Sequence, residues 1–191
     1  MRGDADEVRR SSEVKGAWFT SARRYLTESG QDDVAERMIA RLEPPHLEAF
    51  RDPIASAWYP EETLATTLRI LREETRAERD ERFVQVMQGI THVGLNRFFR
   101  LVLDLSSADF VLRKIPVMWG HIRRGAGKVE VQTDPRGATI RYSEFPWFSD
   151  PNYRLLTVGS IRTLLVACNT SGDVRVGESF HDALTIEITY R

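Results

Sequence analysis

The first half of the chain carries apolar residues three or four positions apart, which is the spacing of one buried face of an α-helix. One helix is expected to begin near Trp18 and to end before Gly30, because glycine suits the left-handed cap that closes many helices. A second is expected from Asp32 or Asp33, either of which can cap it, up to Pro44.

Two aromatic residues, Trp58 and Tyr59, stand directly before Pro60 and two glutamates. Proline suits the start of a helix because its fixed φ fits the helix and its missing N–H would be unpaired there. We therefore expect a helix to open at Pro60, with Trp58 folding back over its first turns as a hydrophobic staple does. A stacking platform for a ligand is the less favoured alternative for these two rings.

The segment 83–105 predicts the longest helix. One stripe at helical spacing faces a core: Phe83, Met87, Ile90, Gly94, Phe98, Leu101 and Leu105. A second face carries His92, Leu95, Phe99 and Leu103, so that this part is apolar nearly all round and must be covered on more than one side. A cavity wall, a subunit interface and plain core remain open as readings of that second face.

Ser106 or Ser107 can cap a further helix over 109–114, and Pro116 marks its end or a kink. After Pro116 the period changes from helical to alternating. An early strand is possible around 118–123, and a β-hairpin is predicted over 129–143 with its turn at 134–137. Helical spacing returns over 155–167 and two strands close the chain. The fold class is therefore α+β: N-terminal helices, then an antiparallel sheet with a hairpin, one helix and two closing strands.

The domain organisation follows from the same pattern. Residues 1–14 mix both charge signs with few apolar groups, which predicts a disordered leader. Residues 15–191 predict a single α+β domain.

Composition narrows the classes of function. The chain has 27 Lys and Arg against 28 Asp and Glu, so no general positive field attracts nucleic acid. The basic run at 113–124 is expected to be a solvated edge rather than a nucleic-acid site. No stretch is apolar enough to span a membrane, and the single cysteine, Cys168, predicts a buried hydrophobe in a reducing, cytoplasmic protein.

No catalytic or metal-binding signature occurs. The four histidines are dispersed, and the stretch at 125–128 lacks the strand–loop–helix context and the final Ser or Thr of a P-loop. No serine or cysteine lies in a nucleophile-elbow motif. We therefore predict no catalytic residue, no metal and no cofactor.

The loop 145–153 gathers large apolar groups, among them Trp147 and Phe148. Such a loop can cover the core, act as the lid of a ligand cavity, or form part of an interface. Core cover is the simplest interpretation, and the other two stay open.

Five short motifs resemble a known family. They are Lys15-Gly16-x-Trp18-Phe19, Trp58-Tyr59-Pro60, Leu112-Arg113-Lys114-Ile115-Pro116, Gly127-Lys128-Val129-Glu130-Val131 and Ala138-Thr139-Ile140-Arg141-Tyr142. Together they resemble the large myxobacterial family of paralogous proteins of unknown function, over roughly residues 15–191. The order of elements is also similar to vinyl-reductase-type sensor domains, haem-based nitric oxide sensors and small subunits of the Golgi tethering complex.

The resemblance implies a domain whose helices and sheet enclose an apolar cavity, used in relatives for small-molecule sensing or for assembly. It does not imply haem, because those sensors hold the propionates with a Tyr-x-Ser-x-Arg motif and this chain has Tyr142-Ser143-Glu144. The cysteine cluster of metal-containing sensors is missing too.

We expect a non-enzymatic cytoplasmic sensor or adaptor module that binds a small apolar ligand or docks a protein partner, with a homodimer as one form. Its expected ligand-binding or interface residues are His92, Leu95, Phe99, Leu103, Trp147 and Phe148. In this hypothesis His92 is the polar handle, although a hydrogen-bonded, partly buried histidine is the commoner case. The alternative is a cofactor-dependent reductase-type enzyme acting on a bound tetrapyrrole-like substrate.

Overall fold

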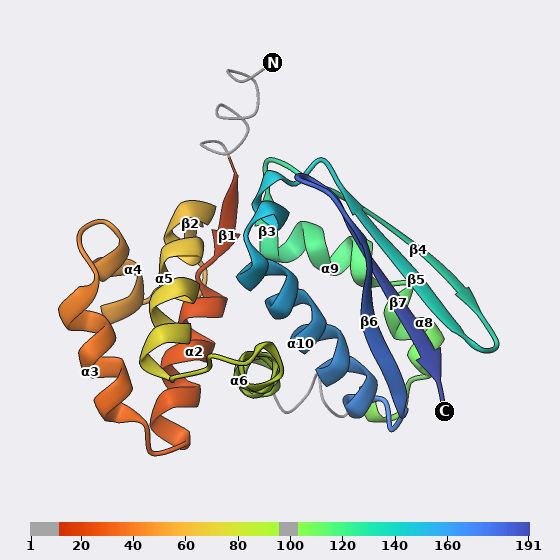
Figure 1. Cartoon of the computed structure of the whole chain (residues 1–191), viewed down its shortest axis with the longest axis horizontal. Coiled ribbons are helices and arrows are strands. Elements are labelled where there is room, and N and C mark those ends of the chain that lie inside the picture. The colour runs from red at the N-terminus through yellow and green to blue at the C-terminus, as the bar shows by residue number, and fades with distance from the viewer. Residues whose placement is uncertain (1–11, 96–102) are drawn as a thin grey trace.

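The computed structural model describes residues 12–95 and 103–191. Helices from the first half of the chain gather on one side, a four-stranded sheet lies on the other, and α10 (Pro151–Ala167) runs between them (Figure 1). The antiparallel α+β class expected from the sequence is confirmed.

The N-terminal helices are α2 (Ala17–Glu28), α3 (Asp32–Arg41), α4 (His46–Arg51) and α5 (Glu61–Glu74). Their boundaries follow the predicted signals. Gly30 has φ +68° just after α2, and Pro60 occupies the cap position before α5. One face of α5 is apolar and buried at Leu64, Leu68, Ile70 and Leu71.

A small sheet joins three distant segments in the order β2 (Trp58–Pro60), β1 (Glu13–Lys15) and β3 (Arg123–Arg124). Trp58 therefore lies in a strand, and the expected hydrophobic staple is wrong. Its ring is flanked by the Lys15 ammonium at 4.2 Å and the Arg124 guanidinium at 4.6 Å. Val14 is only 2% exposed, so the end of the segment assigned to a leader belongs to the fold, whereas residues 1–11 lie outside the described residues.

The predicted long helix is shorter than expected. Helix α6 (Asp80–Gly94) ends at Gly94, and Leu95 leaves the helix with ψ 104°. A helix that continues unbroken from 83 to 105 is therefore wrong, and glycine's low helix propensity gives the physical reason for the end. The core stripe is confirmed in its first half, because Phe83, Met87 and Ile90 are buried.

Two short helices follow. Helix α8 (Ala108–Leu112) is capped as predicted by Ser107, whose hydroxyl accepts from the Phe110 N–H at 3.2 Å. The early strand expected around 118–123 is wrong, because Pro116 opens α9 (Ile115–Ile122) and extended backbone begins at Arg123. Proline is compatible with the first turn of a helix, and here it starts a helix rather than ending one.

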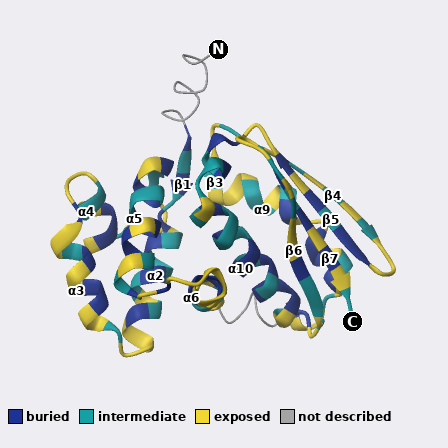
Figure 2. Ribbon diagram, viewed as in Figure 1, coloured by how far each residue is buried: buried dark blue, intermediate teal, exposed yellow. Residues whose placement is uncertain are grey.

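The larger sheet has the strand order β4-β5-β7-β6, all antiparallel: β4 (Lys128–Asp134), β5 (Gly137–Ser143), β7 (Leu184–Tyr190) and β6 (Gly172–Ser179). The predicted hairpin is confirmed in register, with Val131 opposite Ile140. Burial alternates along β5 and β7, so that one face of the sheet lies against the helices and the other is exposed (Figure 2).

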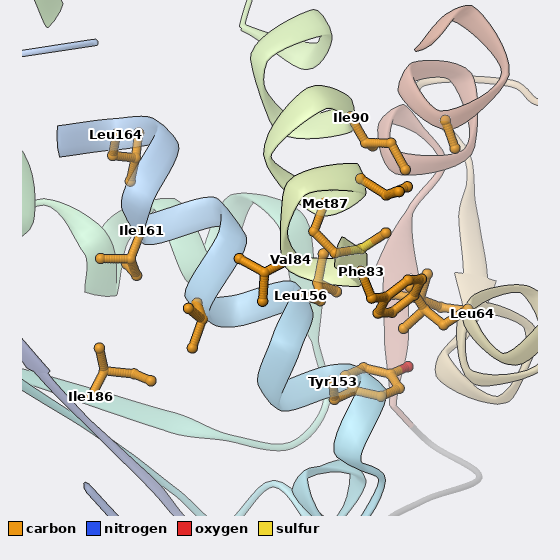
Figure 3. Close-up of a cluster of buried hydrophobic side chains, with 14 of the residues drawn as sticks. Leu64, Phe83, Val84, Met87, Ile90, Tyr153, Leu156, Ile161, Leu164 and Ile186 are labelled. Carbon is orange, nitrogen blue, oxygen red and sulfur yellow. The ribbon is translucent and has the colours of Figure 1, made fainter. Parts of the chain in front are cut away.

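The core continues from the sheet through α10 and α6 to α5. In Figure 3, Phe83 lies beside Leu64 of α5, whereas Val84 points toward α10. Helices α6 and α10 approach closely at Gly159, where an added Cβ would lie 2.6 Å from the Cβ of Met87 and 3.0 Å from the Val84 carbonyl oxygen. Glycine at this position therefore sets how closely the two helices pack.

Candidate functional site

A cavity of about 250 Å³ lies among four helices and the small sheet. Helices α2, α6, α9 and α10 form most of its walls, with β1 and β3 at one end and Tyr142 of β5 behind. Most of the side chains around it are apolar. The described residues that line it are Val14, Lys15, Ala17, Trp18, Ser21, Ile90, Thr91, Gly94, Leu95, Ile115, Met118, Trp119, Ile122, Arg123, Tyr142, Leu156, Thr157, Ser160, Ile161 and Leu164.

Helix α9 supplies one apolar wall through a repeating pattern. Ile115, Met118, Trp119 and Ile122 are three or four residues apart and so share one face of the helix. The turn after β3 accommodates the Trp119 ring, because Gly127 has φ +102° and an added Cβ there would lie 2.8 Å from the indole. The cavity wall thus depends on a helix that sequence patterning had assigned to a strand.

The serine and threonine hydroxyl groups of the lining are already bonded. Thr91 Oγ1 and Ser160 Oγ lie 3.1 Å apart and connect α6 to α10 across the cavity edge. The Thr157 hydroxyl donates to the Tyr153 carbonyl at 2.9 Å, and that of Ser21 donates to the Ala17 carbonyl at 2.7 Å. These bonds let the helices present hydroxyl-bearing residues to an apolar space at little cost.

A buried ion pair closes the end of the cavity at β3. Arg123 Nε lies 2.9 Å from Oε1 of Glu61, and the two side chains are 9% and 0% exposed. The distance is that of a hydrogen bond, but the N–H is not directed at the oxygen, so both atoms lack an aligned partner among the described residues. The contact is therefore an ion pair without an aligned hydrogen bond at these two atoms.

Tyr153 of α10 completes this group. Its hydroxyl lies 2.6 Å from Oε2 and 2.8 Å from the carbonyl oxygen of Glu61, and it can donate to one of them at a time. Burial raises the pKa of Glu61, while the Arg123 charge and the hydrogen bond from Tyr153 oppose that rise. Burial and the neighbouring Glu61 carboxylate raise the pKa of Tyr153, which keeps its phenol protonated.

Aromatic rings surround the Arg123 guanidinium. Its carbon lies 4.5 Å from the ring centre of Trp119, 5.6 Å from that of Phe145 and 6.0 Å from that of Tyr153. Trp119 also contacts Tyr142, with ring centres 5.4 Å apart. Stacking of this kind stabilises a partly desolvated cation and fixes the plane of the guanidinium.

The expected site residues at and after the end of α6 do not share one environment. Leu95 lines the cavity at the end of α6. His92 is exposed, has an interaction partner and is not among the lining residues. Phe99 lies outside the described residues.

The remaining expected residues lie away from the cavity lining. Leu103 is buried in the core at 3% exposure, and Phe148 at 1% packs against Phe145 and Tyr142. Trp147 lies in the 3-10 turn η1 (Pro146–Ser149), half-buried and stacked on Tyr153. Phe148 thus covers the core, the simplest of the interpretations of the 145–153 loop.

Sequence patterning missed Arg123, Glu61 and Tyr153 as one group. Glu61 has a sufficient local explanation at the start of α5, where an acid favours the helix dipole. Arg123 belongs to a basic run that was expected to face solvent. The two residues meet only because β1 brings β2 and β3 together, and no local signal in the sequence reports that pairing.

Two features are absent from residues 12–95 and 103–191. No three His, Cys, Asp or Glu side chains gather there closely enough to hold a metal ion. None of the helices in these ranges has the length and apolar character needed to cross a lipid bilayer.

The chain matches no protein-family model and no curated protein. Its fold is similar to solved H-NOX structures. An H-NOX protein from S. oneidensis in the Fe(II)NO state has a TM-score of 0.70 at 12% identity, covering 93% of this chain and 99% of that one. An unliganded Fe(II) H-NOX protein from K. algicida has a TM-score of 0.67 at 12% identity, with 93% and 97% covered.

An oxygen-binding H-NOX domain related to soluble guanylate cyclases, solved as its oxygen complex, has a TM-score of 0.64 at 13% identity and covers 92% of each chain. At these identities the likeness establishes the fold alone. The expected similarity to the architecture of haem-based nitric oxide sensors is confirmed, while the resemblance to the myxobacterial family stays a prediction.

One of the similar structures addresses heme distortion in the H-NOX family, which raises the question whether the residues of this chain fit a haem. Haem iron in proteins takes an axial His, Cys, Met or Tyr. All four histidines are in the described ranges and none lines the cavity; His92, His121 and His181 are exposed, and His46 bonds Thr63 at 3.0 Å. The residues outside those ranges include no His, Cys or Tyr.

Two lining residues have possible ligand atoms, Met118 and Tyr142. Burial raises the pKa of Tyr142, which keeps the phenol protonated and disfavours iron binding through a phenolate. Counted from Tyr142, Glu144 stands at the Ser position of the Tyr-x-Ser-x-Arg motif and Pro146 at its Arg position, so the motif is absent. The residues present do not fit a histidine-ligated haem.

Proposed function

We propose that this chain is a non-enzymatic small-molecule sensor domain that binds an apolar ligand in the cavity between α2, α6, α9 and α10. The observation that carries the proposal is the cavity itself, an apolar space of about 250 Å³ in a fold shared with an oxygen-binding domain. A cavity of ~150 Å³ lined by aliphatic and aromatic groups is enough to bind benzene. The space here admits a larger apolar group.

The position of the cavity suits a sensor. Trp18 and Ser21 come from the N-terminal helices, whereas Trp119 and Ile122 come from α9, which packs toward the sheet. A ligand between them would contact both layers of the domain. Such a ligand would shift the balance between two arrangements of these layers only if it binds one arrangement more tightly than the other, which is the general condition for a conformational response.

A cytoplasmic location is also part of the proposal. Cys168 is buried at 7% exposure, as expected for a hydrophobic core residue, and burial raises the pKa of its thiol. Both features suit a reduced, unreactive cysteine and hence a cytoplasmic protein. A second form of the proposal is an adaptor module that docks a protein partner or a second copy of this chain.

Calorimetric titration with octanol, a neutral amphipath with an apolar tail, tests the proposal. We expect saturable binding with one site per chain, lost in Leu164→Trp because the larger ring occupies the cavity. Val166→Trp is the matched control, since Val166 is 68% exposed on the same helix and does not line the cavity.

Equal binding of octanol by both variants would place the site elsewhere and contradict the proposal. Native mass spectrometry and an absorption spectrum of freshly purified protein add a second readout. A coloured, stoichiometric redox cofactor would favour the reductase-type alternative instead.

A further inference from the structure

The charged groups of the cavity lining are all of one sign. Among the described lining residues only Lys15 and Arg123 carry charge, and no carboxylate lines the space. The Glu61 carboxylate lies behind Arg123 and does not line the cavity. An apolar cavity with a cation at one end is the usual arrangement for a ligand that has an apolar body and one anionic group.

Arg123 retains unused hydrogen-bond donors. A guanidinium has five N–H donors, one on Nε and four on the two Nη atoms. Nε faces Glu61, and among the described residues neither Nη makes a hydrogen bond. The side chain is 9% exposed, and of its three nitrogens only Nε is fully buried without an aligned partner, so the Nη groups keep surface that a ligand in the cavity can reach.

The fold directs Arg123 inward and Lys15 outward. Arg123 is paired in register with Val14, which is buried, so the two side chains lie on the same face of the small sheet. Lys15 follows Val14 and therefore points to the opposite face, where its ammonium stacks on Trp58 at 4.2 Å. Arg123 is thus the inner cation of the cavity, and Lys15 contributes charge at its rim.

A second donor in the lining has no acceptor. The indole N–H of Trp18 is buried, and no described residue accepts a hydrogen bond from it. An indole nitrogen can only donate, as can a guanidinium. The lining therefore has two residues, Trp18 and Arg123, with N–H groups that no described residue accepts from.

We infer that the ligand is an amphipathic monocarboxylic acid, with its apolar tail between α6 and α10 and its carboxylate on the Nη groups of Arg123. This inference rests on the proposed function and names its ligand class. The planar guanidinium matches a carboxylate through two parallel N–H···O bonds, and charge-assisted bonds of this kind are stronger than neutral ones. Trp119 and Phe145 hold the guanidinium plane before the ligand arrives, so that little ordering entropy is lost on binding.

The existing pair with Glu61 is compatible with this role. Nε serves Glu61, which leaves the four Nη hydrogens for a second carboxylate. Tyr153 holds Glu61 from its other oxygen at 2.6 Å, so Glu61 keeps a partner when the ligand shares Arg123. The Lys15 charge at the rim offsets the repulsion between the two carboxylates.

The test compares ligands of one tail length on the intact protein. Octanoate, octanol and methyl octanoate are titrated into the wild type at pH 7, well above the pKa of the free acid. We expect octanoate to bind at least tenfold more tightly than either neutral compound, with the difference reduced at high salt. Octanoate bound no more tightly than octanol would overturn the inference while the proposed function stands.

Two variants test whether the preference for octanoate depends on Arg123. Arg123→Lys keeps the charge but loses the planar fork, and we expect it to remove most of the preference for octanoate while octanol still binds. Arg124→Lys is the matched control, because Arg124 is the next residue, stacks on Trp58 outside the cavity and does not line it. An unchanged preference in a folded Arg123→Lys protein would overturn the assignment of Arg123.

If Arg123→Lys fails to fold, the wild-type ligand series still decides between an acid and a neutral ligand. Leu164→Trp then shows whether octanoate occupies the cavity, since it should lose octanoate and octanol together. Failure of all three compounds to bind the wild type would contradict both the proposed function and the inference built on it.

Discussion

Helices α6 and α10 are in close contact along one half of their length and border a cavity along the other. In the first half, Gly159 brings α10 so close that its Cα faces Met87 and the backbone of Val84 directly. In the second half, Thr91 and Ser160 still bond at 3.1 Å, but beyond them Ile90 and Leu95 face the cavity. The difference comes from the size of the residues at the contact and from helix α9, which borders the second half.

The comparison shows that apolar side chains alone do not indicate whether a surface is filled. Met87 and Ile90 belong to the same stripe of α6 and are equally buried, at 0% and 1%. Yet only Ile90 lines the cavity. The solid half is closed by a glycine on the partner helix, whereas the hollow half is bounded by α9 and the Glu61–Arg123 pair.

Removal of Glu61 should have the largest effect on the hollow half. Glu61→Leu leaves Arg123 buried without its counter-charge, and we expect a loss of about 3–5 kcal/mol in the free energy of unfolding. Urea denaturation measures it. Adding Arg123→Met should restore part of the loss, because the pair is then replaced by apolar groups. A loss that is unchanged in the double variant would mean that the two residues do not act as a pair.

The solid half is tested at its closest approach. Gly159→Ala adds a methyl group 2.6 Å from Met87 Cβ and 3.0 Å from a backbone oxygen, and we expect it to destabilise the protein by about 1–3 kcal/mol. Gly120→Ala is the matched change in α9, where an added Cβ has no atom within 4 Å. It should be neutral or stabilise by up to ~1 kcal/mol through helix propensity. Equal effects of the two changes would show that the contact at Gly159 is not tight.

Adjacent leucines on α10 compare the two environments at a smaller scale. Leu165 is buried and lies near Gly172 of the sheet, so Leu165→Trp overpacks a filled core and should cost about 1–3 kcal/mol. Leu164→Trp extends into the cavity and should cost less, within about 1 kcal/mol. Thermal unfolding of both variants measures the difference, and a larger loss for Leu164→Trp would mean that the cavity is not free to take a ring.

The smallest effect is a dependence of stability on pH. The pKa of Glu61 is raised by burial from an ordinary value of 4.5, so the folded state holds this proton more tightly than the unfolded state does. The resulting stabilisation is complete below pH 4.5 and is lost as the pH rises through the raised pKa. Relative to Glu61→Gln, which cannot ionise, the wild type should lose stability as pH rises. If the wild type instead gained stability relative to Glu61→Gln as the pH rises, the effect of the Arg123 charge on the pKa of Glu61 would be larger than that of burial.

Local signals in the sequence were enough for most of the fold. Gly30, Pro60 and Ser107 marked helix ends correctly, and alternation over 129–143 gave the hairpin and its register. Each of these features depends on residues close together in the chain. Helix α9 was missed because Pro116 was taken as an end, although proline suits the first turn of a helix equally well.

The site was much less accessible to sequence reasoning. Among the expected residues that the structure describes, only Leu95 lines the cavity, since the helix that carries the chosen face ends at Gly94. Arg123 lies in β3, and Glu61 directly follows β2, the other edge strand of a three-stranded sheet whose strands are two or three residues long. Strands this short carry no periodicity, so the pairing that forms the site depends on tertiary contacts.

The positions of Trp18 and Trp119 have an optical consequence. The two indoles belong to different walls of one cavity, so a molecule entering it must displace the water or void next to both. Indole emission responds to the polarity of its surroundings, and the other two tryptophans, Trp58 and Trp147, do not line the space. Tryptophan fluorescence therefore reports whether the cavity is occupied, without an added label. Replacing one of the two indoles by phenylalanine leaves the signal of the other, so the response of each wall can be measured separately.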